Sequence, residues 1–533
     1  MPSSDCYPID VAPGQSRLFL DYCAADPAVR PFYPSLPRET GWQQRCPRPE
    51  HWNDIVDLLA QQNPSASESI ATLRAGAATV LTGQQVGLFA GPLYTPFKAA
   101  TALARARQAT ATGQPHVAIF WLATEDHDFA EINHVSFPSR KELRKLVYSK
   151  TPAAPIPVGS AVIDETINPL IDQAWELLGS SDAMDALVAA YKPGRTFGQA
   201  FADFYSKAFA VQGLLILDAS SAEIHRLGSP VLKIAIERAD EFHAALLERN
   251  KALEAAGYHA QVAVASESSL LFLLDERTGA RLSLKRTPSS SAEPQGLWQA
   301  GRDRFTTADL LGILAAEPQR ISPAALLRPI FQDHLLGTSL IIGGPAEIAY
   351  FAQSAVLYER ILGRITAAEP RLSATLIEPA IGELLHKHDL GIDRVFHESA
   401  DSLAQLLAAR AMPIEGKQKL SSAGNALDAE LQPLLEYMRA MDPGLGRSAD
   451  TAASKMRYQM NRLRRLAANF EMQREGSLRR HADAIERALN PGGVLQERVH
   501  GAAYYLARYG FGLAEMLTEL ATDPCPGHKA VWL

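Results

Sequence analysis

The densest cluster of ionisable residues in the sequence consists of Glu125, Asp126, His127 and Asp128, with Asn133 and His134 shortly after it. Side chains of these types can hold a divalent metal, transfer a proton, or hydrogen-bond the charged amine of an amino acid. A tight zinc site is disfavoured, because neither HExxH nor a cysteine pair accompanies the cluster. The structural alternative is an acidic helix start, where the helix dipole stabilises carboxylates.

A glycine-bearing loop is the second candidate. It begins with Thr82-Gly83-Gln84-Gln85 and ends with Gly91-Pro92. Glycines let a backbone approach a ligand, and the helix that follows offers free N–H groups to a phosphate or carboxylate. The loop contains neither GxxxxGK[ST] nor GxGxxG, and glycines in strand-to-helix turns are more often structural, so on its own the loop is weak evidence of a binding site.

Three less specific candidates lie further along the chain. Gly343-Gly344-Pro345, followed by Glu347 and Tyr350, either lines the same site or only forms a turn. Arg328 and Arg498 can each bind a phosphate or pair with a nearby carboxylate. No GxSxG motif of serine hydrolases is present.

A repeated strand–loop–helix pattern must position these residues. Apolar runs at 77–81 and 116–123 predict buried strands, and a helix is expected over 94–108 between them. Further strands are expected at 213–218 and 339–345, the last one followed by a helix over 346–362. Continuous apolarity favours a parallel sheet covered on both faces, and both main candidates follow the carboxyl ends of strands, where such sheets bind ligands. Ser220 and Glu223 predict a capping box at the start of a long helix.

The C-terminal third has a different pattern. Apolar residues spaced alternately by three and four run through 427–441 and 456–489, which is typical of a coiled-coil seam, although Pro433 weakens the helix prediction. A helix over 449–489 would be roughly 60 Å long, too long to bury its whole seam on a globular core. We therefore expect an antiparallel helical hairpin and a homodimer through its remaining seam, with an intramolecular hairpin alone as the alternative.

Length and charge exclude several classes of protein. With 533 residues, the chain should form more than one domain. We expect a core over 1–378 with insertions near 141–210 and 278–305, a helical domain over 379–494, and a return to the core over 495–533. The net charge of −7 gives no reason to expect nucleic acid or an anionic membrane as partner, and no apolar run is long enough to span a bilayer.

The four cysteines are few and widely spaced, at positions 6, 23, 46 and 525. A disulfide scaffold is therefore not expected, and a reducing, cytoplasmic location fits. Cys46 and Cys525 are either plain small residues or thiols that handle substrate. The first residues show no signal peptide.

Several phrases together resemble the cysteine ligase family of bacillithiol synthesis (BshC). They lie in the same order from about residue 10 to the end, at 82–95, 120–128, 131–134, 342–350, 370–375 and 495–498. The resemblance implies an α/β fold: a Rossmann-like parallel-sheet core similar to class I aminoacyl-tRNA synthetases, with insertions and a C-terminal coiled coil that dimerises. It also implies a carbon–nitrogen ligase that adds cysteine to glucosaminyl-malate, with ATP and Mg²⁺ as expected cofactors.

Roles for individual residues follow from their positions. We expect the catalytic group to be Glu125, Asp126, His127 and Asp128, with His127 as the base and the two aspartates orienting it or holding Mg²⁺. Substrate contacts are expected from Gln84, Gln85, Asn133 and His134. Nucleotide contacts are expected from Gly83, Gly91, Pro92, Gly343, Gly344 and Arg498.

Two other functional classes stay open. A metal-dependent hydrolase or transferase would use residues 125–128 without ATP. A non-catalytic dimeric scaffold would bind a nucleotide or a partner protein and do no chemistry.

Overall fold

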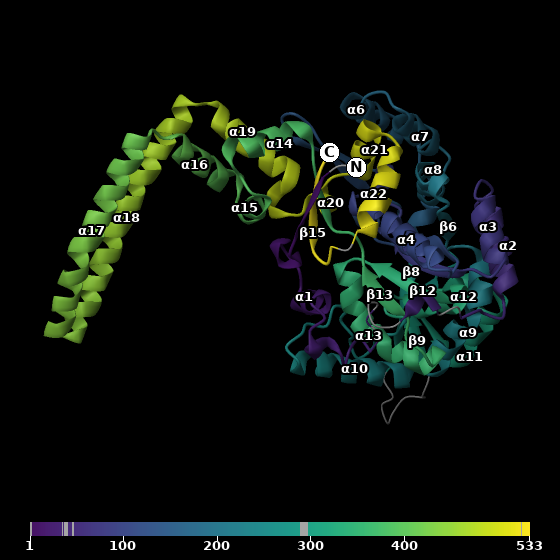
Figure 1. The fold of residues 1–533 in the computed structure, drawn as a ribbon. Helices are drawn as coiled ribbons and strands as arrows, with labels where there is room; N and C mark the ends of the chain where they lie inside the picture. The colour runs from purple at the N-terminus through teal and green to yellow at the C-terminus, as the bar shows by residue number, and fades with distance from the viewer. Residues whose placement is uncertain (1–2, 35, 37–40, 45–46, 288–296, 524) are drawn as a thin grey trace.

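The computed structural model describes residues 3–34, 36, 41–44, 47–287, 297–523 and 525–533. Its centre is a five-stranded sheet in the order β13–β12–β2–β3–β6, with every pair parallel (Figure 1). The strands are β2 (Ala78–Gln84), β3 (His116–Leu122), β6 (Leu215–Asp218), β12 (Thr338–Gly343) and β13 (Ala367–Pro370). The expected parallel Rossmann-like sheet is confirmed.

Both faces of this sheet are buried, which explains the continuous apolar runs. Along β3, Phe120 and Leu122 pack into one hydrophobic core, whereas Ile119 and Trp121 pack into the other. Each such side chain is almost completely buried and contributes about 1.5–3 kcal/mol to folding. The first core lies under α4 (Tyr94–Ala111), α8 (Phe197–Ala208) and α22 (Gly512–Thr522), and the second under α9 (Ala222–Glu237), α12 (Arg328–Leu336) and α13 (Pro345–Leu362).

The capping box predicted at the start of α9 is wrong. Ser221 is the N-cap residue, but its side chain makes no capping hydrogen bond. Ser220 Oγ instead donates to Asp218 Oδ1 at 2.9 Å, and Glu223 pairs with Arg226 one turn later, at 2.6 Å. Both residues of the expected box therefore have other partners.

The stretch 141–210 is mostly helical. It contains β5 (Leu143–Val147), which pairs with β4 (His134–Pro138), and the helices α6 (Asn168–Leu178), α7 (Asp182–Ala190) and α8. Buried aromatic residues such as Tyr148, Phe197 and Tyr205 join it to the first core.

The stretch 278–305 contributes to a second, antiparallel sheet. The order is β10–β9–β8–β7–β11, formed by β7 (Leu271–Leu274), β8 (Arg281–Arg286), β9 (Leu297–Ala300), β10 (Asp303–Thr306) and β11 (Ile321–Pro323). The serine- and proline-rich part of this stretch, 288–296, lies outside the described residues.

The two ends of the chain meet in a third sheet (Figure 1). Strand β15 (His528–Trp532) pairs antiparallel with β1 (Ser4–Tyr7) and parallel with β14 (Ala374–Ile377). A disulfide joins Cys6 to Cys525, 519 residues apart, so Cys525 is neither a plain small residue nor a free thiol. Sequence spacing could not reveal it, because only the pairing of β1 with β15 brings the two cysteines together.

The predicted helical hairpin is confirmed and projects from the rest of the molecule (Figure 1). It consists of α17 (Ile414–Met441) and α18 (Pro443–Arg474), and Leu431 and Leu435 of one helix pack against Ala449 and Ala453 of the other. Pro433 lies within α17 and does not end it. The helix expected over 449–489 is interrupted: α18 ends at Arg474 and α19 (Ser477–Leu489) starts anew.

The remaining helices are α1 (Arg17–Cys23), α2 (Trp52–Gln62), α3 (Ser67–Arg74), α5 (Phe129–Ile132), α10 (Ala239–Ala255), α11 (Thr307–Ala316), α14 (Pro379–His388), α15 (Ile392–His397), α16 (Ala400–Ala411), α20 (Gln496–Val499) and α21 (Ala502–Tyr509). Helix α20 is a single short turn. Among the helices of the described residues, none is both long and apolar enough to cross a membrane.

Candidate active site

The carboxyl ends of three neighbouring strands bring the predicted site residues to one edge of the parallel sheet. Thr82 of β2 lies opposite Ile342 of β12, and Gln84 lies opposite Leu122 of β3. The segments after these strands therefore leave the sheet side by side. Gly83 is required here, because a Cβ at this position would lie 2.9 Å from the carbonyl oxygen of Trp121.

A buried lysine ties two of these segments together. Lys98 Nζ, on α4, donates to the carbonyl oxygen of Gly83 at 2.8 Å and to Gln84 Oε1 at 3.0 Å, and it forms an ion pair with Glu347. Glu347 in turn accepts from the backbone N–H of Gly344 at 2.7 Å. Burial lowers the pKa of Lys98, although Glu347 acts in the opposite direction. Lys98 thus places a positive charge between the ends of β2 and β12.

Further cations surround Tyr94 on the first turn of α4. The hydroxyl of Tyr94 accepts from Gln84 Nε2 at 3.3 Å, and the guanidinium of Arg371 lies 5.2 Å from the centroid of the tyrosine ring. Arg371 is held by buried Glu497 at 2.6 Å. Arg498 is close enough to help lower the pKa of Lys98. Its side chain is exposed and makes no hydrogen bond or ion pair with the described residues, so it is available to a ligand.

The far end of the loop connects to the segment that carries Arg498. Gly91 has a φ of +66° and ψ of −165°, a conformation that only glycine adopts readily, and its carbonyl oxygen accepts from Ala502 N at 2.9 Å. Pro92 pairs with Gly501. These contacts fix the α20–α21 segment beside the loop.

Asp126 is held by two arginines from distant parts of the chain. Arg328 of α12 grips both carboxylate oxygens, with Nη1 3.1 Å from Oδ2, and Arg281 Nη1 of β8 lies 3.7 Å from Oδ1. Gln85 Nε2 donates to Oδ2 at 3.3 Å. Burial raises the pKa of Asp126, but the two arginines outweigh burial and lower it overall. The carboxylate is therefore ionised and anchors two cations.

Glu125 points to another partner. Its Oε1 lies 2.7 Å from Nε2 of His225 on α9, and both side chains are buried. Burial alone would lower the pKa of His225, but the adjacent Glu125 raises it overall. Nδ1 of the same ring contacts the carbonyl oxygen of Ile321 at 3.0 Å. Glu125 thus joins the strand end to α9.

His127 lies beside the Asp126 group. Its Nδ1 is 3.3 Å from Arg281 Nη1, and its ring centroid is 5.4 Å from that of Phe272. Burial and the neighbouring Arg281 lower the pKa of His127, so the imidazole is neutral at neutral pH. A neutral imidazole can accept a proton, provided that Arg281 releases Nδ1 when substrates bind.

The remaining predicted residues make local contacts in the turn after β3. Asp128 is the N-cap residue of α5 and accepts from Ala130 N at 3.1 Å. Asn133 Nδ2 donates to the carbonyl oxygen of Tyr148 at 3.3 Å, and His134 Nδ1 lies 3.1 Å from that of Ala130. Asp128 still affects the pKa of His127, whereas Asn133 and His134 serve to connect α5 with β4 and β5.

Sequence reasoning missed several residues of this site, among them Lys98, Arg281 and His225. Lys98 lies one helical turn after Tyr94, so helical spacing could have placed both on one face. No local signal marks Arg281 or His225, because they reach the site from the second sheet and from α9.

The carboxylates of the site do not fit a protein-held metal. Asp126 is neutralised by Arg328 and Arg281, and Glu125 by His225. In the described part of the chain, no three His, Cys, Asp or Glu side chains gather as metal ligands would.

Comparisons with known proteins agree with this architecture. Residues 5–372 match the family model of the bacillithiol biosynthesis BshC N-terminal Rossmann-like domain, and residues 374–532 match the BshC C-terminal coiled-coil domain. Proteins named "Putative cysteine ligase BshC" are 39% identical in Koribacter versatilis, over 99% of both chains, and 33% identical in Solibacter usitatus, over 97% of this chain and 98% of the relative.

A solved structure titled as a putative arginyl-tRNA synthetase from Campylobacter jejuni is 11% identical and covers 86% of this chain and 98% of its own, with a TM-score of 0.21. At that score the likeness adds nothing to the fold assignment, which rests on the parallel sheet and the two matched domains. The chain belongs to the BshC family of bacillithiol biosynthesis, a family of ligases.

Proposed function

We propose that the protein joins the carboxyl group of cysteine to the amine of glucosaminyl-malate, with ATP activating the carboxyl. The observation that supports this most directly is the gathering of cations and a neutral imidazole at the strand ends. Lys98, Arg328 and Arg498 are the cations, and His127 is the imidazole. Family membership gives the class of reaction.

Chemistry explains why activation is needed. A free carboxylate has no leaving group and an ammonium has no lone pair, so the two do not form an amide directly. In the proposed first step, a carboxylate oxygen of cysteine attacks the α-phosphorus of ATP, and pyrophosphate leaves. In the second step, the deprotonated amine attacks the acyl carbon, the acyl–phosphate bond breaks, and AMP leaves. Binding both reactants side by side supplies much of the rate enhancement.

The side chains of the site divide between these two steps. Arg498, which is exposed, and Lys98, which is fixed, would stabilise the charge on the phosphates as the bond to pyrophosphate breaks. Gly83, Gly91, Pro92, Gly343 and Gly344 would shape the nucleotide pocket by keeping the backbone accessible.

The second step belongs to the residues beside Asp126. His127 would take the proton of the amine, with Asp126 holding Arg281 and Arg328 in place around it. Gln84 and Gln85 would hydrogen-bond the substrates. Since Asp126 is paired with arginines, we assign Mg²⁺ to the phosphates of ATP and to no side chain.

An omission assay tests this function. Purified protein is incubated with cysteine, glucosaminyl-malate and Mg-ATP, leaving out one component at a time, and the products are identified by mass spectrometry. The expected result is the amide product only in the complete mixture, with AMP released in equal amount. Release of ADP in place of AMP would mean that the activated intermediate is an acyl phosphate and not an adenylate. Product without ATP would contradict the proposal, as would no product from a folded protein.

We place the reaction in the cytoplasm, where ATP and cysteine are available.

A further inference from the structure

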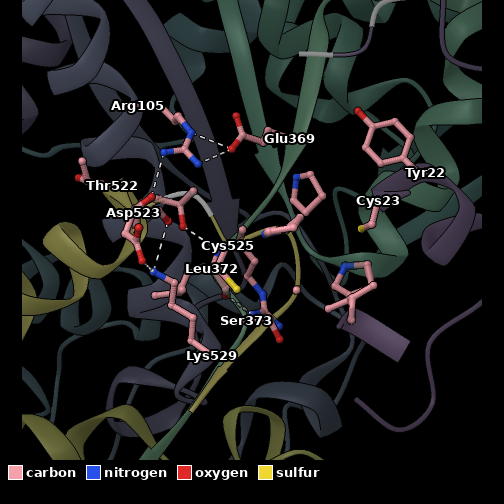
Figure 2. Close-up of a pocket in the computed structure, with 18 of the residues that line it drawn as sticks. Tyr22, Cys23, Arg105, Glu369, Leu372, Ser373, Thr522, Asp523, Cys525 and Lys529 are labelled. Carbon is pink, nitrogen blue, oxygen red and sulfur yellow. Dashed lines mark hydrogen bonds and ion pairs between the residues drawn. The ribbon is translucent and has the colours of Figure 1, made fainter. Parts of the chain in front are cut away.

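A cavity lies beside the candidate active site and shares Arg371 with it, but none of the residues assigned to the two proposed reaction steps lines it. It has a volume of about 510 Å³, within the usual range of about 300–1,000 Å³ for small-molecule sites. One wall is formed by the N-terminal segment with α1, and the other by the segment between α22 and β15 (Figure 2). The end of β13 and one side of α4 complete it.

The charged groups on its walls are balanced in pairs. Arg105 pairs with Glu369 at 2.5 Å and also donates to the carbonyl oxygen of Ala521 at 2.9 Å. Lys529 pairs with Asp523 at 2.8 Å. The third cation on the walls, Arg371, is already paired with buried Glu497 at 2.6 Å. A polyphosphate entering the cavity would meet the carboxylates of Glu369 and Asp523 as well as these cations. A small molecule with one ammonium and one carboxylate can instead align with both pairs.

Sulfur is the other distinctive feature of the cavity. Cys525 lines it and is bonded to Cys6, and the side chain of Cys23 lies on the opposite side beside Tyr22 (Figure 2). Cys6 is exposed and Cys525 is partly exposed. A thiol bound in the cavity would therefore lie next to a disulfide with which it can exchange.

The disulfide also holds the cavity together. The N-terminal wall, including Phe19 and Tyr22, follows Cys6 along the chain, and the opposite wall carries Cys525 and Lys529. In the β1–β15 pair, Cys6 lies opposite Lys529. Opening the disulfide would remove the covalent link between the two walls.

We propose that this cavity is a second binding site, for a small zwitterionic thiol, and that the bound thiol exchanges with the Cys6–Cys525 disulfide. The thiolate sulfur attacks Cys525 Sγ, the bond to Cys6 breaks, and Cys6 leaves as a thiolate that takes up a proton. A second thiol then attacks the ligand sulfur, releasing the ligand disulfide and the Cys525 thiol. Two thiols are oxidised and one protein disulfide is reduced. The inference does not depend on the ligase reaction.

The test measures loss of the Cys6–Cys525 disulfide in the full chain, by alkylation and peptide mass spectrometry. Cysteine is the probe, and mercaptoethanol, which has neither charge, is the comparison at equal thiolate concentration. Binding before exchange predicts a rate that saturates with cysteine but rises linearly with mercaptoethanol. S-methylcysteine, which keeps the charges and lacks the thiol, should compete and slow the cysteine reaction.

A matched pair of variants tests the charges. Glu369→Gln should raise the half-saturating cysteine concentration about tenfold, the effect of losing one charged contact. Glu359→Gln, on an exposed part of α13, should leave it unchanged. The proposal would be overturned if, in the wild-type protein, the rate of disulfide loss rose linearly and equally with both thiols and S-methylcysteine did not compete. This test does not depend on whether a variant folds. The readout follows the disulfide and not the product, so this result is separate from the outcome of the ligase assay.

Discussion

At the scale of single residues, His127 is the group on which the proposed chemistry depends most. Burial and Arg281 lower its pKa, so it is neutral and able to accept the proton of the amine. We expect both His127→Asn and His127→Gln to lower kcat by about 10²-fold or more, the usual contribution of a general base. Product formation under saturating substrates measures the effect, and circular dichroism checks that both variants fold.

The two substitutions distinguish two roles. Asparagine places a polar group near the position of Nδ1, and glutamine places one near Nε2. A proton acceptor is lost in both. If glutamine retained activity, His127 would act as a hydrogen-bond donor through Nε2, and the role of base would be refuted.

Arg498 is the residue that most directly tests the nucleotide site. It is exposed near Lys98 and has no partner among the described residues, so its removal leaves no buried carboxylate unpaired. Arg498→Gln should raise KM for ATP by about tenfold to a hundredfold, the value of a charged hydrogen bond of about 1.5–3 kcal/mol. Initial rates at varied ATP measure it. Arg480→Gln on α19, also exposed, is the matched control and should match wild type. An unchanged KM in Arg498→Gln would remove this arginine from the site.

Residue types were predictable from the sequence, but their partners were not. Adjacent strand ends and dense polar residues identified Asp126, His127 and Gln85 as neighbours, and the structure places them together. Arg281 comes from 154 residues further along the chain and joins them only through the second sheet. Its pairing with Asp126 depends on tertiary packing, for which local spacing gives no signal.

At the scale of elements, the third sheet makes stability depend on acidity through His528 of β15. Its ring contacts Ser373 Oγ at 2.8 Å and Thr375 Oγ1 at 2.9 Å, and burial lowers its pKa to about 4. The unfolded chain binds a proton near pH 6.5, whereas the folded chain does not until about pH 4. The contribution of His528 to the free energy of unfolding is therefore complete above about pH 6.5 and decreases as the pH falls. At pH 5 it has decreased by about 2 kcal/mol.

Urea unfolding at pH 7.5 and pH 5 measures how much unfolding free energy is lost between the two pH values. His225, whose pKa is raised, acts in the opposite direction, so the comparison must be between wild type and variant. His528→Gln should reduce the loss of stability at pH 5 by about 2 kcal/mol. His259→Gln, at an exposed position, should leave the loss as in wild type. The same pH dependence in His528→Gln and wild type would contradict the assignment.

Elements followed the sequence closely where periodicity was strong. The strands β2, β3, β6 and β12 form at the predicted apolar runs, because such runs fit a sheet buried on both faces. The cap of α9 did not form as predicted, since Ser220 and Glu223 found nearer partners. The pairing of β1 with β15 could not be predicted from the sequence, since pairing between distant strands leaves no local pattern.

At the scale of the whole molecule, the projecting hairpin leaves part of its seam uncovered. Met456, Leu463 and Phe470 are spaced by seven residues along α18 and are 50%, 53% and 62% exposed. Seven-residue spacing places them in one stripe, which is typical of a coiled-coil contact with another helix. Within one chain, the hairpin packs instead through the cluster around Leu431 and Ala453.

We therefore predict that two copies of the chain associate through this stripe. Light scattering after size-exclusion chromatography should give twice the chain mass for wild type and a single chain mass for the double variant Leu463→Glu, Phe470→Glu, because carboxylates cannot be buried unpaired at such a contact. Val211 is an apolar residue that lies outside the hairpin and is 93% exposed, so the control variant Val211→Glu should remain dimeric. The monomeric variant should keep its ligase activity, since the side chains assembled at the strand ends come from one chain. A wild-type monomer, or a double variant that stays dimeric, would show that the stripe does not join two copies.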